Sequence, residues 1–357
     1  MIKARGLTIL ALAMAFLAFL VCLSSCGDSR SQKFAVELAE LAGALDAEFI
    51  AVRHDNESLA ESVRRAYADK SAKTPPFESL LVEKGGNLTF SNKQYFAFKD
   101  NGGPSIVSMD GRGGFSDIGA DLKNTVARGL ALTEGFKEIV QRRDYCKLFV
   151  GIAGKDYFTA FGYPYVDWGS MIPDPEVIHG ALGGDFRNFP FYAPVTAKND
   201  PERKALWSPD VFVSMDVGVL FESIAPVYLE ANDPEIFADT TIDIFIDKFN
   251  EKHLLNDRKL LILASPNGTI VGASKTAIET LRILLPTFDY LKQLSSTQGL
   301  GDRFGFGAYE DAGLRTVGEK LAKGESTFET EIGNTKYAVF VERIPEVGFR
   351  LVGLIKR

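Results

Sequence analysis

The sequence has few of the residues that build metal centres, disulfide frameworks and thiol-based active sites. It contains three cysteines and three histidines among 357 residues. Cys22 and Cys26 lie at the end of an N-terminal apolar region, so Cys146 has no partner for a disulfide within the mature chain. The histidines lack metal-ligand spacing, and neither a Gly-x-Ser-x-Gly elbow nor a P-loop occurs. We therefore expect no metal, no cofactor and no catalytic residues, and a hydrolase built on paired carboxylates is the least favoured alternative.

An excess of positive charge and repeated apolar runs are also lacking. The formal net charge is −7, with both signs interspersed along the chain. Such a chain repels polyanions, so nucleic acid is not an expected partner. Beyond the N-terminal region, no segment approaches the ~18 apolar residues of a membrane-spanning helix. Hydrophobic residues make up 46% of the chain, which is enough for packed cores and argues against disorder.

The N-terminal region has the three parts of a secretion signal. Lys3 and Arg5 precede an apolar run from Leu7 to Leu23, in which Thr8 is the only clearly polar residue. The run ends in Leu-Ser-Ser-Cys, which resembles the lipobox of bacterial lipoproteins. The resemblance implies a signal peptide at 1–25, cleavage before Cys26, lipid (palmitate-type acyl chains) on its thiol, and a lipidated tether at 26–33. Loss of the two basic residues would bring the net charge from −7 to −9.

Two other interpretations of this region stay open: an uncleaved membrane anchor, and an ordinary secretory signal that is removed together with Cys26. The lipobox interpretation is favoured, because the position of the motif at the end of an apolar run is specific. Several acyl chains would then anchor the protein firmly, at ~0.8 kcal/mol per buried methylene. It places the mature chain in the cell envelope, anchored to a membrane and facing the periplasm or the cell exterior.

The rest of the chain is expected to form an α+β fold of two tandem antiparallel modules. Phe34, Leu38, Leu41 and Leu45 repeat at helical spacing, which predicts a helix to about residue 69 within a long-helix segment that we assign to 34–80. We assign residues 81–256 to a membrane-distal module and 257–357 to a membrane-proximal one. The expected elements are hairpins at 95–109, 147–161 and 259–273, strands at 219–228 and 241–246, helices at 117–142, 276–294 and 314–321 with a short one ending near 255, and a closing meander at 328–332, 336–343 and 349–355.

Five segments, in this order, resemble the double Cache family of extracytoplasmic sensor domains. They are Leu148-Phe-Val-Gly-Ile152 with Gly154, Asp185-Phe-Arg-Asn-Phe-Pro-Phe-Tyr192, Trp207-Ser-Pro209, Ile224-Ala-Pro-Val-Tyr228 and Thr241-Ile-Asp-Ile244. The family has a long N-terminal helix along two stacked PAS-like modules, and small ligands usually bind in the membrane-distal one. The resemblance thus implies a ligand-binding distal module.

The stretch that ends at Tyr192 also departs from the family pattern. Phe189 stands where amino-acid-binding members have a carboxylate-binding arginine, and Phe191 replaces a tryptophan, while Tyr192 is kept. Arg187 could substitute for the missing arginine, or it could form a local ion pair with Asp185. Our candidate ligand-binding residues are Asp243, Tyr192, Phe191, Trp207, Arg187 and Phe189. The aromatic members could instead form the core of a long loop.

The strand around Asp243 supports one of these candidates from its own pattern. Residues 242, 244 and 246 are all isoleucine and share one face of a strand, so Asp243 points to the other face. If helices cover the isoleucine face, Asp243 lies where a ligand would bind, and its carboxylate suits an ammonium or hydroxyl group. The alternative is an ordinary solvated or salt-bridged aspartate.

These expectations together describe a lipid-anchored sensor or receptor for a small molecule, which could be an amine, an amino-acid-like compound or a carboxylate metabolite. The sequence stops at Arg357, directly after its last predicted strand. Signal receptors of the double Cache family continue there into a membrane helix, so we expect a transmembrane signalling or transport partner. The alternative is a structural or assembly lipoprotein with a degenerate pocket.

Overall fold

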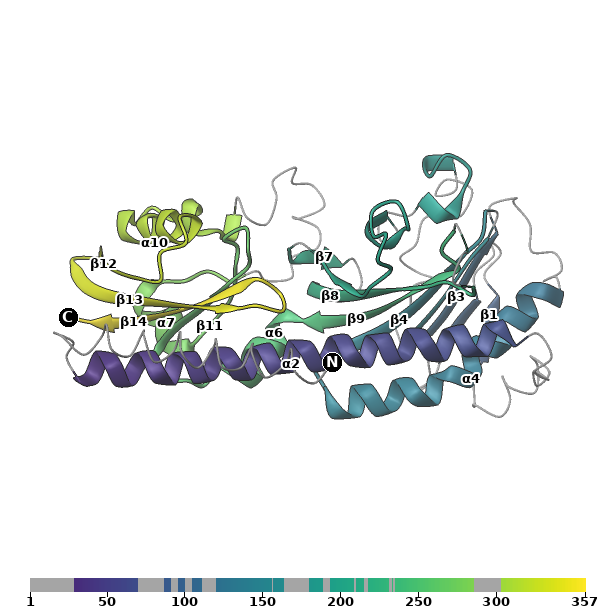
Figure 1. Ribbon diagram of the computed structural model, residues 1–357, viewed down its shortest axis with the longest axis horizontal. Coiled ribbons are helices and arrows are strands. Elements are labelled where there is room, and N and C mark those ends of the chain that lie inside the picture. Colours follow the sequence, from purple (N-terminus) through teal and green to yellow (C-terminus); the bar gives the residue numbers. More distant parts are fainter. Residues whose placement is uncertain are drawn as a thin grey trace, which may run out of the picture.

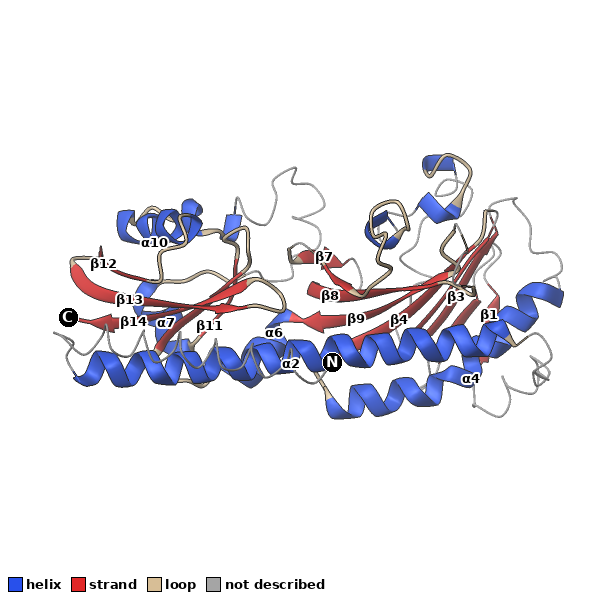
Figure 2. Cartoon of the chain, in the orientation of Figure 1, coloured by secondary structure: helices blue, strands red, loops and turns tan. Residues whose placement is uncertain are grey.

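The computed structural model describes most of the chain beyond the N-terminal region (Figures 1 and 2). The described residues are 29–69, 87–90, 96–99, 105–110, 120–155, 157–163, 180–188, 193–208, 210–214, 218–230, 233, 235–285 and 303–357. Cys26 and the predicted signal peptide lie outside them. Within the described residues, no helix combines the length and the apolar character needed to cross a membrane.

One long helix, α2 (Ser29–Ala68), runs along both sheets of the molecule (Figure 1). It begins five residues before the predicted start, because residues 29–33 contain no glycine or proline that would end a helix. It ends at Ala68, close to the predicted end of the helical pattern near residue 69. Residues 70–80 of the segment assigned to 34–80 lie outside the described residues. The side chains that α2 buries recur at helical spacing: Phe34, Leu38, Ala42, Leu45, Phe49, Val52, Asn56, Leu59 and Val63.

The first sheet has seven strands in the order β3-β5-β4-β9-β8-β6, with β7 also paired to β8. All its pairings are antiparallel. The strands are β3 (Ser105–Asp110), β4 (Cys146–Ala153), β5 (Tyr157–Tyr163), β6 (Leu206–Trp207), β7 (Phe212–Ser214), β8 (Gly218–Val227) and β9 (Ala238–Phe245). Helix α4 (Ala120–Arg142) lies beside α2 in Figure 1 and contacts β4 and β5.

The hairpin predicted at 95–109 is wrong. Strand β2 (Phe96–Lys99) pairs with β1 (Asn87–Phe90) in a separate two-stranded sheet, and β3 pairs with β5. Local turn residues cannot decide between these partners. Strand β5 pairs with β4 along one edge and with β3 along the other, and β3 comes before α4 in the chain.

The second sheet has five strands in the order β11-β10-β14-β13-β12. They are β10 (Leu260–Ala264), β11 (Ile270–Ala273), β12 (Thr327–Ile332), β13 (Thr335–Ile344) and β14 (Phe349–Lys356). The two sheets are joined by α6 (Ile246–Asn250) and the π-helical turn η4 (Glu251–Leu255). The boundary that we placed between residues 256 and 257 falls in the connection between β9 and β10.

Two helices cover the second sheet, and both have a capped N-terminus. Ser274 caps α7 (Lys275–Leu281), and Asp311 caps α10 (Ala312–Ala322). Of the helix predicted for 276–294, α7 ends at Leu281, because Arg282 adopts the left-handed conformation (φ 54°). Residues 286–294 of that prediction lie outside the described residues.

The main apolar core is continuous through both sheets beneath α2. It contains residues of α2, of the helix-facing side of the first sheet and of the second sheet. Two smaller cores lie on the opposite faces, one between the second sheet, α7 and α10, and one between the first sheet and residues 182–206. A long helix along two antiparallel-sheet modules is the α+β fold that we predicted, and the structure confirms it.

Candidate functional site

Strand β9 presents two chemically different faces. Ile242 and Ile244 lie in the core beneath α2, fully buried. Residues of a strand alternate between its faces, so Asp243 points to the opposite side, away from the long helix. Its side chain is also buried, with a residue exposure of 6%. The orientation inferred from the isoleucine pattern is therefore the one that the strand adopts.

The neighbouring strands place two more charged side chains beside Asp243. Lys147 on β4 and Glu222 on β8 are its direct cross-strand partners in the antiparallel register. The three residues form a row across the sheet on one face, and Asp239 lies on the same face further along β9. Lys147 and Asp239 are buried, at 3% and 0% exposure. We call Lys147, Glu222, Asp239 and Asp243 the carboxylate cluster.

Burial and like charge change the protonation of this cluster. The pKa of Glu222 is raised from 4.5 to about 9, first because burial disfavours the charged form and then because Asp243 and Asp239 repel a third negative charge. A hydrogen bond to Asp243 favours protonated Glu222 further, while Lys147 acts in the opposite direction. Near neutral pH, Glu222 therefore carries a proton that it can donate to Asp243.

The segment between β5 and β8 covers this face of the sheet. It includes the 3-10 turns η2 (Phe186–Asn188) and η3 (Ala193–Val195). Phe186 and Val195 pack with Ile224, which lies on the same face as Glu222. A packed apolar cover limits the access of water to the cluster. Three of the predicted ligand-binding residues, Phe189, Phe191 and Tyr192, fall between the two turns and lie outside the described residues.

Arg187 is held by two acidic neighbours. Its guanidinium forms a bidentate ion pair with Asp185, in which Nη2 donates to Oδ2 at 2.6 Å and Nε donates to Oδ1 at 2.9 Å. Nη1 donates to Glu235. The pKa of Asp185 is lowered, chiefly by its hydrogen bond from Arg187. This is the local ion pair that the sequence left open as an alternative to ligand binding.

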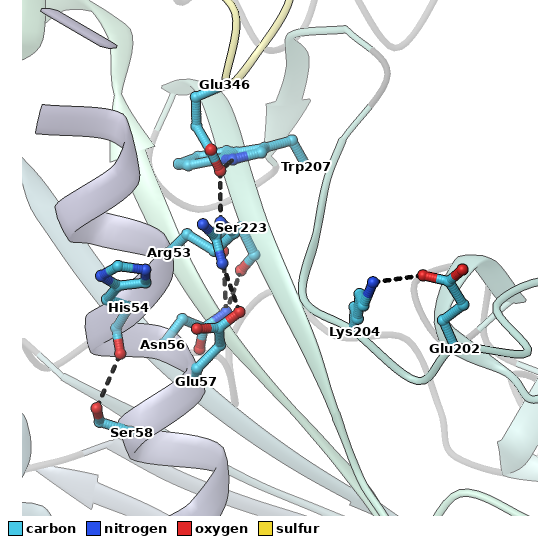
Figure 3. Close-up of polar contacts among 10 residues, drawn as sticks. All are labelled: Arg53, His54, Asn56, Glu57, Ser58, Glu202, Lys204, Trp207, Ser223 and Glu346. Carbon is cyan, nitrogen blue, oxygen red and sulfur yellow. Dashed lines mark hydrogen bonds and ion pairs between the residues drawn. The ribbon is translucent and has the colours of Figure 1, made fainter. Parts of the chain in front are cut away.

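Trp207 does not lie with Asp243. It pairs with Ser223 of β8 and faces α2, on the opposite side of the sheet from Glu222. Its ring stacks on Phe221 at 5.1 Å between centroids, and Nε1 donates to Glu346 of the second module at 2.9 Å (Figure 3). The expected grouping of Trp207 with Asp243 is corrected: Trp207 belongs to the junction between the modules. The sequence could not fix the register of a two-residue strand, and the register decides its face.

Glu222, Lys147 and Asp239 are not among the site residues predicted from the sequence. A signal was present, because Glu222 is the only charged residue in the strand-like run 219–228, and Lys147 begins an otherwise apolar strand. Ionisable residues in buried strands are uncommon and call for a partner. What the sequence did not contain was the register that brings them together.

Among the described residues, the free cysteine and the possible metal-ligating groups are candidates for a second site. Cys146 is buried, and burial raises the pKa of its thiol, which favours the unreactive protonated form. Among the residues that the structure describes, no three His, Cys, Asp or Glu side chains are arranged to hold a metal ion.

No protein-family model matches the chain, and no curated protein matches it. Among solved structures, the extracellular domain of the putative histidine kinase mmHK1S-Z3 aligns with a TM-score of 0.46 and 9% identity, over 92% of this chain and 94% of that one. The sensory domain of the Campylobacter jejuni chemoreceptor Tlp3 with isoleucine bound gives 0.46 and 9%, over 91% and 94%. The extracellular domain of the putative histidine kinase soHK1S-Z6 gives 0.43 and 12%, over 91% and 95%.

Proposed function

We propose that this protein is an extracytoplasmic, lipid-anchored sensor or receptor that binds a small molecule bearing an ammonium group. The observation that carries the proposal is the carboxylate cluster. Glu222, Asp239 and Asp243 share one face of the first sheet with Lys147, and Lys147, Asp239 and Asp243 are buried. Buried carboxylates are stabilised by cationic groups, so a ligand ammonium suits this face.

The ligand would bind to the distal module, on the face covered by residues 180–208. Asp243 is the residue that we expect to contact the ammonium, with Glu222 as its hydrogen-bonding neighbour. Tyr192, Phe191 and Phe189 are proposed as aromatic walls next to it, since aromatic faces attract cations. Arg187 is proposed to contact the ligand only if its pairing with Asp185 and Glu235 opens.

A screen of amines by thermal shift tests the binding proposal. The purified wild-type chain is compared with Asp243→Asn, which keeps the side-chain shape and removes its charge. A ligand at a hundredfold over its dissociation constant should stabilise the wild type by ~2.7 kcal/mol, and the variant should lose most of that stabilisation. Tyr192→Ala should weaken the same response.

Glu202→Gln is the matched control for this screen. Glu202 lies in the covering segment, but it is exposed and pairs with Lys204 at 2.5 Å (Figure 3). It should respond to the ligand as the wild type does. If no amine shifts the melting temperature, or if Asp243→Asn responds like Glu202→Gln, the assignment fails.

The anchor and the partner belong to the same proposal. A protein held to the membrane through acylated Cys26 must pass its ligand or its conformational change to a transmembrane partner. Mass spectrometry of the mature N-terminus should find acyl chains on Cys26. A Cys26→Ser protein that is still cleaved and still sediments with membranes would refute the anchor.

One observation favours the alternative, a structural or assembly lipoprotein. Arg187, the residue that could replace the missing ligand-binding arginine, is already engaged by Asp185 and Glu235. In that case affinity capture from membranes would recover a protein partner with equal yield from wild-type and Asp243→Asn chains.

A further inference from the structure

Strand β6 and the residues directly after it contact both the side of the carboxylate cluster and the junction between the modules. Leu206 packs with Ile224 in the core on the side of the carboxylate cluster, while Trp207 points to the junction on the other side. Ser208 then bonds to the backbone of Glu222 itself. Its amide donates to the Glu222 carbonyl at 2.9 Å, and its hydroxyl accepts from the Glu222 amide at 3.2 Å. A shift of Glu222 therefore moves Ser208 directly.

The same short stretch holds the β13–β14 turn of the second module. Glu346 accepts a hydrogen bond from Trp207 at 2.9 Å and one from Arg53 of α2 at 2.5 Å (Figure 3). Its backbone amide donates to Asp46 of α2 at 2.8 Å. The carboxylate is only 14% exposed, so these bonds are shielded from water.

The stretch from β6 to Asp210 also contacts the β10–β11 turn. Oδ2 of Asp210 accepts hydrogen bonds from Asn267 and Thr269, each at 3.2 Å. Two separate turns of the second module are thus hydrogen-bonded to Trp207 and Asp210, which lie close together in the sequence of the first module. One of those residues, Trp207, directly precedes the serine that is bonded to Glu222.

We propose that Leu206, Trp207, Ser208 and Asp210 form a coupling segment that transmits the state of the carboxylate cluster to the two turns of the second module. This rests on the proposed function, since it assigns a regulatory output to the same site. The route is short and polar: from Glu222 through Ser208 to Trp207 and Asp210, and from these to Glu346 and to Asn267 with Thr269.

Helix α2 is the competing route, because it also contacts both modules. Its Asn56 is bonded to Ser223 and Thr240, which are neighbours of Glu222 and Asp239 in the chain, and its Arg53 reaches Glu346. The two routes differ at one point. Of the two routes, the coupling segment bonds directly to the β10–β11 turn through Asp210. Helix α2 reaches that turn through the β13–β14 turn, since Arg350 at the start of β14 donates to the Pro266 carbonyl. Removing the polar contacts of Trp207 and Asp210 therefore separates the routes.

Hydrogen exchange of the full chain, followed by mass spectrometry, distinguishes the routes without any ligand. The exchange is measured near pH 10, above the pKa of about 9 of Glu222 in the wild type, where Glu222→Gln keeps the cluster in its neutral, hydrogen-bonding state with little change of shape. The substitution should alter amide exchange severalfold in residues 265–269 and 344–348. In a Trp207→Phe and Asp210→Ala background, which keeps an aromatic ring at the junction but removes both polar contacts, Glu222→Gln should leave both turns unchanged.

Glu202→Gln is the matched carboxylate-to-amide control, and it should leave both turns unchanged in either background. Two results would overturn the proposal: no effect of Glu222→Gln on the turns, or the same effect in both backgrounds. The outcome is independent of ligand discovery. A compound that binds wild type, loses affinity in Asp243→Asn and leaves both turns unaltered would refute the coupling while the proposed binding function stands.

Discussion

At the scale of single residues, Glu222 makes the stability of the protein depend on pH. Its pKa is about 9 in the folded chain and near 4.5 when unfolded, so between these values the folded state binds more protons. Stability should therefore fall as pH rises through this window, by at most about 1.4 kcal/mol per unit for one proton. In Glu222→Gln, whose neutral amide can still donate to Asp243, this fall should disappear.

Urea unfolding at a series of pH values measures the effect. The midpoint of Glu222→Gln should match that of the wild type near pH 4 and exceed it at pH 8, with the same m-value. Glu202→Gln, which changes an exposed carboxyl in the covering segment, should follow the wild-type curve. Parallel curves for wild type and Glu222→Gln would show that Glu222 is not protonated in the folded state.

Asn56 is a buried polar residue that holds α2 against the first sheet. Its Nδ2 donates to the carbonyls of Ser223 at 2.8 Å and Thr240 at 3.1 Å, and its Oδ1 accepts from the Thr240 hydroxyl at 2.8 Å. Asn56→Ala would leave buried groups on two strands without these partners, and we expect a loss of about 3 kcal/mol. Ser58→Ala, at an exposed position of the same helix (Figure 3), should change stability by less than about 0.5 kcal/mol.

Residue by residue, the sequence predicted the direction of one side chain of the site but not its neighbours. The alternation of isoleucines set the face of Asp243, because alternation is a local property of a strand. The partners Lys147 and Glu222 come from strands about 100 and 20 residues away, and only the register of three strands brings them together. The same lack of register put Trp207 on the wrong face.

At the scale of elements, two glycines of α4 should respond oppositely to alanine. A Cβ on Gly129 would stand 2.1 Å from the ring of Phe161 on β5, whereas one on Gly135 would meet nothing within 4 Å. Gly135→Ala should stabilise the protein by about 1 kcal/mol through helix propensity. Gly129→Ala should destabilise it, because α4 must move away from the sheet. Melting temperatures compare the two, and equal shifts would mean that α4 does not pack closely on β5.

The elements that the sequence predicted well are those that local pattern determines. The β4–β5 and β10–β11 hairpins and the β12–β14 meander have short turns between strands with strong apolar patterns, and all are confirmed. The errors came from long-range choices and from helix ends. Strand β3 takes β5 as its partner across α4, and α7 stops at Arg282, an arginine that carries no sequence signal for the left-handed conformation.

At the scale of the whole molecule, the two modules share one core, and Phe49 stands at its centre. Its ring contacts Trp207 and Phe221 of the first sheet, Phe249 of α6 and Phe349 of the second sheet, at centroid distances of 5.5, 6.1, 5.2 and 5.8 Å. A shared core predicts that both modules unfold together. Amides in β4 and β13 should then exchange with the same opening free energy in the wild type.

Phe49→Ala should lower that free energy by about 3–5 kcal/mol and also make it unequal in the two sheets. Phe306→Ala is the control, since Phe306 is as deeply buried but lies in the core of the second module alone. It should destabilise the protein by a similar amount while β4 and β13 keep equal values, because the shared core is intact. If amides in β4 and β13 keep equal opening free energies in both variants, contacts other than those of Phe49 hold the modules together. If the wild type already shows two values, the continuous core does not make the molecule one cooperative unit.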